Sequence, residues 1–455
     1  MSKKMGIKEY DVFVIGTGTA GKMVAKACAQ AGKNVAIADN KAFGGTCALR
    51  GCDPKKVLLG LSEILDRCKQ MQGKGVKSLP AINWEDLQSF KETFVDAVPM
   101  ATEKDLRALG ISLYHQSPYF LDENSLSVEG KTIKANKVVI ATGNKPIQID
   151  ITGWDLTLNS DEFLNLEKLP ESMLFVGAGY IGMEFAHLAA SLGVKVTLIE
   201  GAERPLSRFD EDLVASLVKA MEANGVRFIF NADVYKIEKL RKYFRVSANQ
   251  NDKEIEEKTE MVINTAGRIP AIDELNLDQG NVAHSKKGIT VNTHLQNTGN
   301  KNVYACGDVA DSSGLPLTPL SSFEAELVID QLLKGEKPNE VDYPNQPSVV
   351  FTHPQIAMVG LTEEEAKQKN LSFKVKCKTQ LDWYNAKREN HAFYGFKTLV
   401  DKKTNQILGA HIIAPQAAEM INLFTLAMNL KLDTQALKKM VFSYPSWGND
   451  IKSMI

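Results

Sequence analysis

The sequence lacks the extremes of charge and hydropathy that would assign it to a special class of protein. Its formal net charge is −1, so neither sign predominates and the charge does not predict binding to nucleic acid or to a charged membrane surface. No window approaches the roughly 20 consecutive apolar residues of a membrane span. Residues 1–6 are basic, but a strand-like segment follows them directly, without the apolar core of a signal peptide. We therefore expect a soluble, cytoplasmic protein.

Cysteine is scarce, with six residues in the chain, which argues against the disulfide framework of a small secreted domain. Only Cys47 and Cys52 are close together in the sequence. In a reducing compartment a close pair is catalytic or metal-binding more often than structural, and no second cysteine pair or histidine pair accompanies it to complete a zinc site. The other four are scattered and are interpreted as small buried or incidental residues: Cys28, Cys68, Cys306 and Cys377.

The length predicts more than one domain. A chain of 455 residues exceeds what one hydrophobic core usually holds, so two or three domains are expected. Apolar residues make up 44% and charged residues 24%, which is ordinary globular usage and does not indicate disorder or a fibrous repeat.

Two segments far apart in the sequence, residues 10–39 and 173–200, follow one plan. Each reads as an apolar strand, a glycine-rich turn, an amphipathic helix, a second strand and an acid, which is Asp39 in the first copy and Glu200 in the second. The acid follows the first glycine by the same number of residues in both copies. Two complete copies predict that the chain binds two dinucleotides. The glycines of the pattern are Gly16, Gly18 and Gly21, and then Gly177, Gly179 and Gly182.

The residue types in this pattern suit the chemistry of a dinucleotide. The first glycine permits a tight turn, the second lets backbone N–H groups approach a pyrophosphate, and the third lets the helix pack close to the strand. The start of the helix offers unpaired donors and a partial positive charge to the phosphates. Asp39 and Glu200 are placed to accept hydrogen bonds from ribose hydroxyls.

Further strands are predicted at residues 138–143, 261–267 and 303–308, the last ending in Gly-Asp, where ligands bind in open α/β sheets. After a polar stretch near residues 334–347 the pattern changes. Residues 393–400 and 407–413 indicate antiparallel strands, with helices beyond them. We interpret this last part as a separate α+β domain.

The segment 44–56 reads Gly-Gly-Thr-Cys-Ala-Leu-Arg-Gly-Cys-Asp-Pro-Lys-Lys. With it the chain resembles the FAD-dependent pyridine-nucleotide disulfide oxidoreductases, which include glutathione reductase, dihydrolipoamide dehydrogenase and mercuric reductase. Leu49 stands where the family usually has Asn. The resemblance extends over nearly the whole chain, through the Ala-Thr-Gly turn at 141–143, Leu-Thr-Pro at 317–319 and Phe-Thr-x-Pro at 351–354.

The resemblance implies an α/β fold with two Rossmann-like domains and a C-terminal α+β dimerisation domain. The expected boundaries are FAD binding in 1–149 and 271–340, NAD(P) binding in 150–270, and the interface in 341–455. It implies a homodimer with an active site shared between subunits.

The resemblance also assigns residues to the two cofactors. FAD is expected at Gly16, Gly18, Thr19, Gly21, Asp39, Gly45, Thr46, Thr142, Gly143, Gly307, Asp308 and Thr318. The nicotinamide dinucleotide is expected at Gly177, Gly179, Tyr180, Ile181, Gly182, Glu200 and Gly267.

The family's redox roles carry over to the cysteine segment. Cys52 would be the thiol next to the flavin and Cys47 the interchange thiol that attacks substrate, while Lys55 or Lys56 would pair with Glu184 near the reactive nitrogen of the flavin. The Cys-x4-Cys spacing is expected to place both sulfurs on one face of a helical turn, close enough to bridge. A helix N-terminus and a lysine both favour a thiolate there.

The end of the second fingerprint bears on the choice between NADH and NADPH. An acid at Glu200 accepts from a ribose 2′-hydroxyl and repels a 2′-phosphate, which favours NADH. Arg204 and Arg208 lie close in sequence and leave NADPH open.

The chain departs from the family near its C-terminal end. Glutathione and lipoamide enzymes carry His-Pro there, with Glu five residues after the His, and the histidine serves as acid and base. Here Tyr444 and Asn449 stand at those positions, although Asp450 is adjacent. A phenol has an ordinary pKa near 10 and imidazole near 6.5, so a phenol is a poor proton shuttle at neutral pH. We list Tyr444 with the catalytic residues and expect inefficient turnover of glutathione disulfide or dihydrolipoamide.

No other histidine has an obvious catalytic context. His353 precedes Pro354 within a different motif, and the other six are interpreted as ordinary surface or core residues. The aromatic pair Trp383-Tyr384 is interpreted as packing within the last domain, with substrate stacking as the alternative.

The leading hypothesis is an NAD(P)H-dependent flavoenzyme that passes electrons to a small disulfide, thiol or other electrophile and serves redox homeostasis. A diaphorase or quinone reductase is the alternative that Tyr444 motivates. A mercuric-reductase-like enzyme is less favoured, because no cysteine follows Cys377 to hand over a metal ion. A non-catalytic subunit is the least favoured, because the cysteines and Glu184 are intact.

Overall fold

The structure is a computed structural model and describes residues 7–334, 340–380 and 382–455. The chain divides into two compact units, which are described separately. The first unit comprises Met1–Lys55, Ser89–Ile147 and Arg268–Tyr343, and the second comprises Lys56–Gln88, Gln148–Gly267 and Pro344–Ile455. Both contain helices and sheets, and the predicted α/β class is confirmed.

The first unit is built on a seven-stranded sheet in the order β3-β2-β1-β6-β5-β4, with β18 pairing the other end of β6. The parallel strands are β1 (Lys8–Ile15), β2 (Val35–Ala38), β3 (Ser112–Tyr114), β6 (Lys131–Ile140) and β18 (Val303–Ala305). The antiparallel strands are β4 (Tyr119–Asp122) and β5 (Ser125–Val128). These strands confirm the predictions at residues 10–15, 34–39, 138–143 and 303–308.

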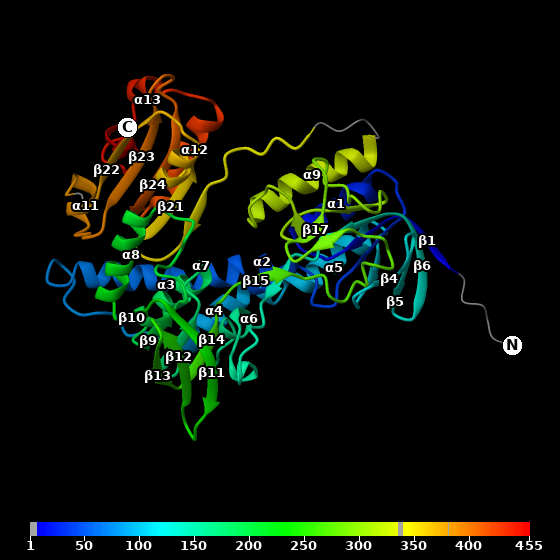
Figure 1. Cartoon of the computed structure of the whole chain (residues 1–455), viewed down its shortest axis with the longest axis horizontal. Coiled ribbons are helices and arrows are strands. Elements are labelled where there is room, and N and C mark those ends of the chain that lie inside the picture. The colour runs from blue at the N-terminus through cyan, green and yellow to red at the C-terminus, as the bar shows by residue number, and fades with distance from the viewer. Residues whose placement is uncertain (1–6, 335–339, 381) are drawn as a thin grey trace. The chain divides into compact units, whose positions relative to one another are not determined.

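Both faces of this sheet are covered, which explains its nearly continuous apolar strands. On one face, Val12 and Val14 of β1 belong to a buried cluster with α1 (Thr19–Gln30) and α9 (Thr318–Lys334). Figure 1 shows α9 lying over α1 above the first unit's strands. On the other face, Phe13 packs in a second cluster with Ile289 and Val303.

The second unit contains its own parallel sheet, in the order β10-β9-β8-β14. Its strands are β8 (Ser172–Val176), β9 (Lys195–Ile199), β10 (Val226–Ile229) and β14 (Met261–Asn264). Helix α7 (Tyr180–Ser191) joins β8 to β9, and α8 (Glu211–Ala223) precedes β10. A three-stranded antiparallel sheet follows, with β11 (Ala232–Lys239), β12 (Phe244–Gln250) and β13 (Lys253–Thr259). The predicted second strand–glycine turn–helix–strand is confirmed.

The C-terminal part of the second unit is a five-stranded antiparallel sheet in the order β20-β21-β24-β23-β22. This sheet packs against helix α12 (Ala417–Asn429). Its strands are β20 (Ser348–Val350), β21 (Gln355–Gly360), β22 (Phe373–Lys378), β23 (Gly395–Asp401) and β24 (Ile407–Ala414). The predicted antiparallel strands and later helices are confirmed.

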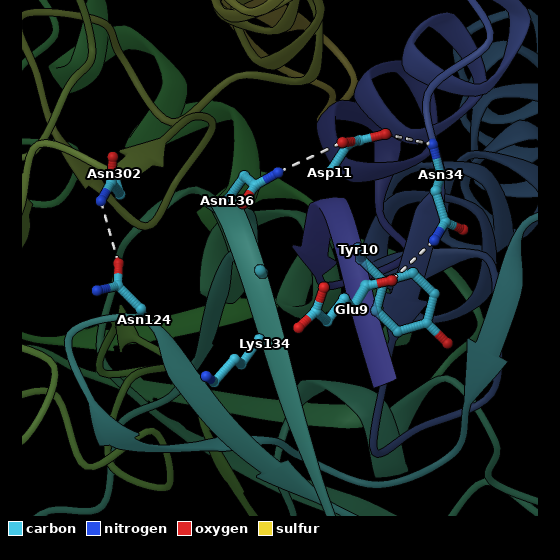
Figure 2. A pocket seen from close by; sticks show the side chains of 9 residues that line it. Glu9, Tyr10, Asp11, Asn34, Asn124, Lys134, Asn136 and Asn302 are labelled. Carbon is cyan, nitrogen blue, oxygen red and sulfur yellow. Dashed lines mark hydrogen bonds between the residues drawn. The ribbon is translucent and has the colours of Figure 1, made fainter. Parts of the chain in front are cut away.

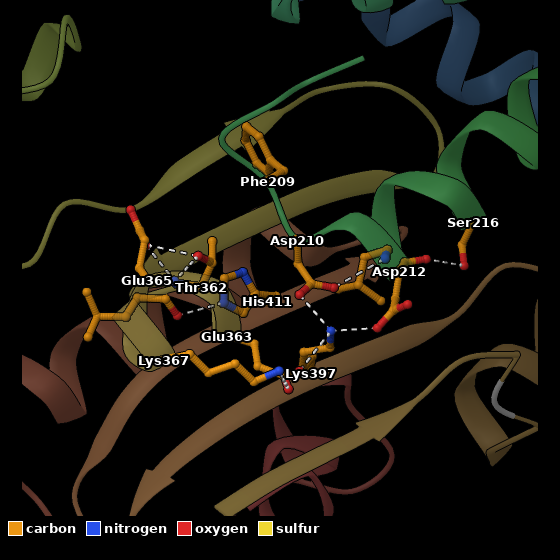
Figure 3. Close-up of polar contacts among 12 residues, drawn as sticks. Phe209, Asp210, Asp212, Ser216, Thr362, Glu363, Glu365, Lys367, Lys397 and His411 are labelled. Atoms are coloured by element: carbon orange, nitrogen blue, oxygen red, sulfur yellow. Dashed lines mark hydrogen bonds and ion pairs between the residues drawn. The ribbon is translucent and has the colours of Figure 1, made fainter. Parts of the chain in front are cut away.

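A buried cation joins this sheet to the start of α8 (Figure 3). Lys397 of β23 is 4% exposed, and its ammonium lies 2.8 Å from Asp210, 2.5 Å from Asp212 and 3.5 Å from Glu363. Burial opposes the charge, but the hydrogen bonds to Asp210 and Asp212 outweigh it and raise the pKa of Lys397. Asp210 also caps α8 by accepting from the Leu213 N–H.

Apart from the helices of the cysteine segment and the two helices before β3, the remaining elements are short connections and C-terminal helices. They are β7 (Asn144–Pro146), η1 (Trp154–Leu156), α6 (Ser160–Phe163), β15 (Arg268–Pro270), β16 (His284–Ser285), β17 (Gly288–Thr290), β19 (Ala310–Asp311), α10 (Glu363–Gln368), α11 (Tyr384–Arg388), α12 (Ala417–Asn429), α13 (Thr434–Lys439) and α14 (Trp447–Met454). Helices α4 (Trp84–Val95) and α5 (Val98–Ala108) precede β3. Among the described residues, no helix has the length and apolar character needed to cross a membrane.

Candidate active site

The two neighbouring cysteines lie on two successive helices. Cys47 is within α2 (Gly45–Arg50) and Cys52 is the first residue of α3 (Cys52–Gln70). The prediction of a single helical turn is therefore corrected. Gly51 interrupts the helix at φ −143° and ψ −112°, and a Cβ there would lie 2.9 Å from the Thr46 carbonyl oxygen, so the interruption needs a residue without a side chain.

One hydroxyl serves both sulfurs. The Thr318 Oγ1 donates to Cys47 Sγ at 3.3 Å and lies 3.5 Å from Cys52 Sγ. The hydrogen bond with Cys52 and then burial raise the pKa of the Cys47 thiol, while the Thr318 hydroxyl opposes the rise. Thr318 begins α9, and its contact with the sulfurs was not predicted from the sequence, which assigned it only to FAD.

The first glycine turn is held by contacts that exclude any side chain. Gly16 has φ +108°, and a Cβ on it would lie 2.3 Å from the Ala141 carbonyl oxygen. A Cβ on Gly21 would lie 2.0 Å from the Gly16 oxygen, and one on Gly45 would lie 2.3 Å from the Gly18 Cα. The starts of α1 and α2 therefore touch through glycine alone, as close packing around a pyrophosphate requires.

The acid of the first fingerprint is bonded to its own turn. Asp39 Oδ2 accepts from the Thr17 N–H at 2.9 Å and from the Thr17 hydroxyl at 2.5 Å, and Oδ1 accepts from the Lys41 N–H at 3.0 Å. The Thr17 hydroxyl in turn accepts from the Gly44 N–H at 3.1 Å. This chain of bonds ties the glycine turn to the segment that leads into Cys47.

The carboxyl end of β18 opens on a cavity of about 310 Å³ within the first unit, lined by Arg268, Gly307 and Asp308 among others. Burial raises the pKa of Asp308, and the nearby Arg268 guanidinium opposes the rise. Asp308 was predicted at a ligand site, and it lies at the carboxyl edge of the sheet, where open α/β sheets bind ligands.

A buried carboxylate supports this turn from below. Glu324 of α9 is 2% exposed, and it accepts from the Gly307 N–H at 2.6 Å. Its other oxygen accepts from the Ser312 hydroxyl at 2.6 Å and the Tyr343 hydroxyl at 2.5 Å. The role of Glu324 was not predicted from the sequence, because nothing in the helical pattern around it distinguishes it from a surface glutamate.

The first unit fits FAD. Within the described residues, the buried Thr142 Oγ1 has no hydrogen-bond partner, and a Cβ on the adjacent Gly143 would meet nothing within 4 Å. The N-cap of α1, Gly18, has no side-chain cap, so the first-turn N–H groups are available to phosphate. An open cradle with an unused hydroxyl and free donors is what a bound dinucleotide requires.

The second glycine turn repeats the first. Gly177 has φ +101°, a Cβ on it would lie 2.5 Å from the Ala266 Cα, and one on Gly182 would lie 2.2 Å from the Gly177 oxygen. Glu200 accepts from the Ala178 N–H at 2.6 Å. A Cβ on Gly179 or on Gly267 would meet nothing within 4 Å, which leaves open space for a ligand. Tyr180 and Ile181 form the first turn of α7, with Tyr180 exposed.

The two arginines after this fingerprint differ in their surroundings. The Arg204 guanidinium is folded onto its own loop and donates to the carbonyl oxygens of Leu206, Ser207 and Phe209 at 2.8–3.3 Å. Arg208 is exposed. The other Glu200 oxygen accepts from the Ala202 N–H at 3.0 Å, so this carboxylate is held on both sides.

Lys56, one of the two lysines predicted to pair with Glu184, forms an ion pair with it. Within the second unit, Lys56 Nζ lies 2.9 Å from Glu184 Oε2, and Glu184 is 1% exposed. The other carboxylate oxygen accepts from the Phe351 N–H at 2.9 Å, and the Lys56 ammonium lies 3.8 Å from the centre of the Phe351 ring. The adjacent Lys55 is buried. Because the Glu184 carboxylate is buried, it depends on this ion pair more than an exposed carboxylate would.

Tyr444 is 70% exposed, and its ring centre lies 6.0 Å from that of the exposed Tyr384. Asp450, which follows Asn449, is engaged elsewhere, because its Oδ2 accepts from the Tyr394 hydroxyl at 2.9 Å and from the Asn385 amide at 3.1 Å. Trp383 packs against Tyr394, in line with the packing interpretation of that aromatic segment.

Histidines were interpreted from the sequence as ordinary residues, and four of the seven are buried: His187, His353, His391 and His411. Three of these, His187, His353 and His391, are brought into one neighbourhood of the second unit although 204 sequence positions separate the first from the last. No sequence pattern could have shown this. Among the described residues, no group of three or more His, Cys, Asp or Glu side chains is arranged to hold a metal ion.

Another polar cavity, of about 580 Å³, lies at the amino ends of β1 and β18 in the first unit (Figure 2). Its polar groups bond to one another: the Asn34 backbone N–H and the Asn136 amide donate to Asp11, and the Asn302 amide donates to Asn124. It is at the opposite edge of the sheet from the glycine turn, so it is not the dinucleotide site.

The fold and these sites define an oxidoreductase of the two-dinucleotide type, and comparison with known proteins agrees. Residues 10–325 match the model of the pyridine nucleotide-disulphide oxidoreductases, and residues 346–455 match that of their dimerisation domain. The chain belongs to the pyridine nucleotide-disulphide oxidoreductase family.

Individual relatives span nearly the full chain. Glutathione reductase of Nostoc sp. is 30% identical over 98% of this chain and 99% of its own length. Dihydrolipoyl dehydrogenase 3 of Haloarcula marismortui is 30% identical over 97% and 94%. The structure is similar to that of the HOCl-induced flavoprotein disulfide reductase RclA of Escherichia coli, with a TM-score of 0.87 and 29% identity over 98% and 99% of the two chains. The predicted family is confirmed.

Family membership establishes the general chemistry. The family depends on FAD and binds NAD(P), and its members are oxidoreductases that act on sulfur groups. The named relatives differ in substrate, so family membership alone identifies neither the substrate nor the electron donor of this chain.

Proposed function

We propose that this chain passes electrons from NADH through FAD to the Cys47–Cys52 pair and from there to a small disulfide or other electrophile. The observation that carries the proposal is the Thr318 hydroxyl shared by the two sulfurs, at the end of a segment tied by hydrogen bonds to the first glycine turn. A surface cysteine pair with a structural role would not need a common hydroxyl.

Bound FAD would supply the two-electron chemistry that couples hydride transfer from NADH to reduction of the Cys47–Cys52 disulfide. The protein's own residues would carry out the exchange of sulfur bonds with the substrate. The Cys47 thiolate attacks one sulfur of the substrate disulfide, and the other leaves and takes up a proton. Cys52 then attacks Cys47 in the mixed disulfide, which closes the Cys47–Cys52 bond and releases the second substrate thiol. The Thr318 hydroxyl donates to whichever sulfur carries the charge.

We propose Gly16, Gly18, Thr19, Gly21, Asp39, Gly45, Thr46, Thr142, Gly143, Gly307, Asp308 and Thr318 as the residues that hold FAD. For the nicotinamide dinucleotide we propose Gly177, Gly179, Tyr180, Ile181, Gly182, Glu200 and Gly267. The repeated turn geometry and the unused Thr142 hydroxyl support this assignment. By the same family argument, Lys56 and Glu184 serve the flavin.

The preference for NADH rests on two side chains. Both Glu200 oxygens accept backbone N–H groups, which holds a negative charge where a 2′-phosphate would have to bind. The Arg204 guanidinium is occupied by carbonyl groups of its own loop, so binding a 2′-phosphate would require breaking those bonds.

We propose that the working form is a cytoplasmic homodimer. The last part of the chain matches a dimerisation domain, and it exposes apolar side chains that include Val441, at 97%, and Leu430. Large exposed apolar residues in one domain favour burial against a partner. In that dimer Tyr444 would face the partner's cysteine pair, as the family's histidine does.

The exposed pair of Tyr384 and Tyr444 favours a quinone as a second candidate acceptor, because planar rings stack on aromatic side chains. In that case Cys47 would not be needed. Undiminished quinone turnover by a Cys47→Ala variant, with loss of disulfide turnover, would support this second activity.

The decisive experiment is anaerobic reduction of the FAD-loaded protein by NADH in a stopped-flow spectrophotometer. We expect a long-wavelength absorbance from a thiolate beside oxidised flavin, absent in Cys52→Ser and retained in Cys47→Ser. Persistence of the band in Cys52→Ser would refute the assignment. The reduced protein is then mixed with glutathione disulfide, lipoamide, coenzyme A disulfide, quinones and Hg²⁺ in turn. Comparison with Tyr444→His shows whether the missing imidazole decides the acceptor.

A further inference from the structure

Three buried imidazoles meet one carboxylate inside the second unit. His187 of α7 is 1% exposed, His353 is 6% exposed and His391 is 7% exposed. The His187 Nε2 lies 2.9 Å from Oδ2 of Asp66 on α3, and the ring centres of His353 and His391 are 5.3 Å apart. Two helices and two segments of the C-terminal part therefore meet at titratable groups.

The His187 Nε2 has two neighbours that it cannot serve together. The His353 backbone N–H donates to this nitrogen at 3.2 Å, while the Asp66 carboxylate lies 2.9 Å from it. A bare Nε2 can accept from the N–H, and a protonated Nε2 can donate to the carboxylate, but one nitrogen cannot do both. The bond from the His353 N–H therefore requires a His187 Nε2 that carries no hydrogen.

The bond from His353 is the second of two that fasten the same segment to α7. The Phe351 N–H donates to Glu184 Oε1, and the His353 N–H donates to His187, three residues further along the helix. Phe351 also places its ring against the Lys56 ammonium. Residues 351–354 therefore contact the Lys56–Glu184 pair at one end and the His187 imidazole at the other.

The ring nitrogens of these histidines have few hydrogen-bond partners. Within the described residues, His187 Nδ1, both ring nitrogens of His353 and the Nε2 of His391 are buried without a hydrogen-bond partner. The charged groups near His353 and His391 include Asp66, Arg67 and Lys69, all on α3, and Lys69 lies 3.6 Å from Asp66. Asp66 contacts His187 and is also shared with Lys69 and the Ser191 hydroxyl, so it offers His353 and His391 little compensation for a positive charge.

We propose that His353 and His391 form an acid-sensitive latch on residues 351–354, and that the closed latch positions the Lys56–Glu184 pair. Protonation of these two buried rings leaves cations without hydrogen-bond partners, which opens the segment, detaches the His353 N–H from His187 on α7 and withdraws the Phe351 N–H from Glu184. The role of that pair at the flavin rests on the proposed function, whereas the latch itself does not.

The sign and size of the effect follow from linkage. Burial lowers the pKa of His353 to about 3 and of His391 to about 4, from an ordinary value near 6.5. The closed state thus binds fewer protons than the open state, so the latch is fully favoured above pH 6.5 and weakens as pH falls below it. With two histidines, the open population rises up to about 10³-fold between pH 7.5 and 5.0.

The test is hydrogen exchange by mass spectrometry on the FAD-loaded full chain at pH 7.5 and 5.0, corrected for intrinsic rates. We expect protection of peptides covering residues 349–356 to fall at least about 100-fold at the lower pH. The double variant His353→Gln/His391→Gln should change less than about threefold. His411→Gln is the matched control, because His411 is also buried in this unit but bonds to the Leu361 carbonyl, and it should retain the wild-type fall.

Unchanged protection of the wild type at pH 5.0, or a wild-type fall in the double variant, would overturn the latch. Should the double variant not fold, the single variants His353→Gln and His391→Gln replace it, and each should show a smaller fall than the wild type because one titrating ring has been removed. The positioning role is read from the rate of flavin reduction by NADH, whose acid limb should move to lower pH by about one unit or more in either variant. An unmoved limb refutes that role, while absence of flavin reduction at pH 7.5 refutes the proposed function and not the latch.

Discussion

The two glycine turns are alike down to single hydrogen bonds. In each, the acid at the end of the second strand accepts from the N–H after the first glycine, from Thr17 to Asp39 and from Ala178 to Glu200. In each, the third glycine lies against the carbonyl oxygen of the first. The fingerprint therefore specifies the turn and the start of the helix and says nothing about which dinucleotide binds.

The two units differ in how buried charge is held. In the first unit, Glu324 is satisfied entirely by neutral donors, including the Gly307 N–H beside the proposed flavin site. In the second, Lys397 is held by carboxylates and joins α8 to the C-terminal sheet. The first arrangement orients backbone donors around a ligand, and the second fastens two layers together. Five variants test the comparison of the two units.

The largest effect is expected from Lys397→Met. It leaves Asp210 buried without its cation, which costs about 3–5 kcal/mol of stability. All four tryptophans (Trp84, Trp154, Trp383 and Trp447) lie in the second unit, so urea unfolding followed by tryptophan fluorescence reports that unit and flavin release reports the first. The tryptophan transition should move while bound flavin at zero urea stays stoichiometric. Lys242→Met, at an exposed ion pair, should leave the transition close to that of the wild type. Equal shifts in the two variants would contradict the contrast.

Alanine at the two first glycines should separate the cofactors. Gly16→Ala and Gly177→Ala each combine a positive φ with a backbone clash and should cost at least about 2 kcal/mol locally. Gly16→Ala is expected to purify without flavin. Gly177→Ala should keep flavin and raise the KM for NADH at least about tenfold. Gly60→Ala, within α3 and with open space around it, serves as the neutral control. Loss of flavin from both variants would show that the two turns are not independent sites.

Glu324→Gln tests the neutral arrangement. The amide replaces one acceptor oxygen by a donor, so at least one of the three donors loses its partner, at a cost of about 1–3 kcal/mol. We expect flavin to dissociate about 10–100 times more readily, measured by fluorescence of released flavin on dilution. Glu326→Gln, exposed on the same helix, should bind flavin like the wild type.

The smallest effect is expected at the coenzyme acid. Glu200→Gln removes the charge but keeps the side chain's length, and the ratio of kcat/KM for NADH to that for NADPH should fall about tenfold, or about 1.4 kcal/mol. The exposed Glu203→Gln in the same loop should leave the ratio unchanged. A rise in the ratio would count against Glu200 as the residue that selects NADH.

Sequence could predict what covalent geometry demands and could not predict what distant packing decides. The glycine turns were predictable, because a tight strand–turn–helix requires glycine at set positions. The geometry of the Lys56–Glu184 pair was not, since it depends on the direction in which α3 presents its side chains to a helix far along the chain. The same holds for Glu324 and for the three histidines, whose meaning lies in partners from other segments. The interruption at Gly51 was missed because Cys-x4-Cys spacing also suits an unbroken helix.

The hydroxyl of Thr318 has a consequence for how charge is distributed on the cysteine pair. It holds one hydrogen and lies within reach of two sulfurs, so it can turn toward only one thiolate at a time. A change in which sulfur is ionised is therefore accompanied by rotation of a single C–O bond, with no movement of the backbone. Thr318 acts as a rotor that follows the negative charge, and a valine in its place would leave the pair's shape intact while removing the hydrogen that stabilises either thiolate.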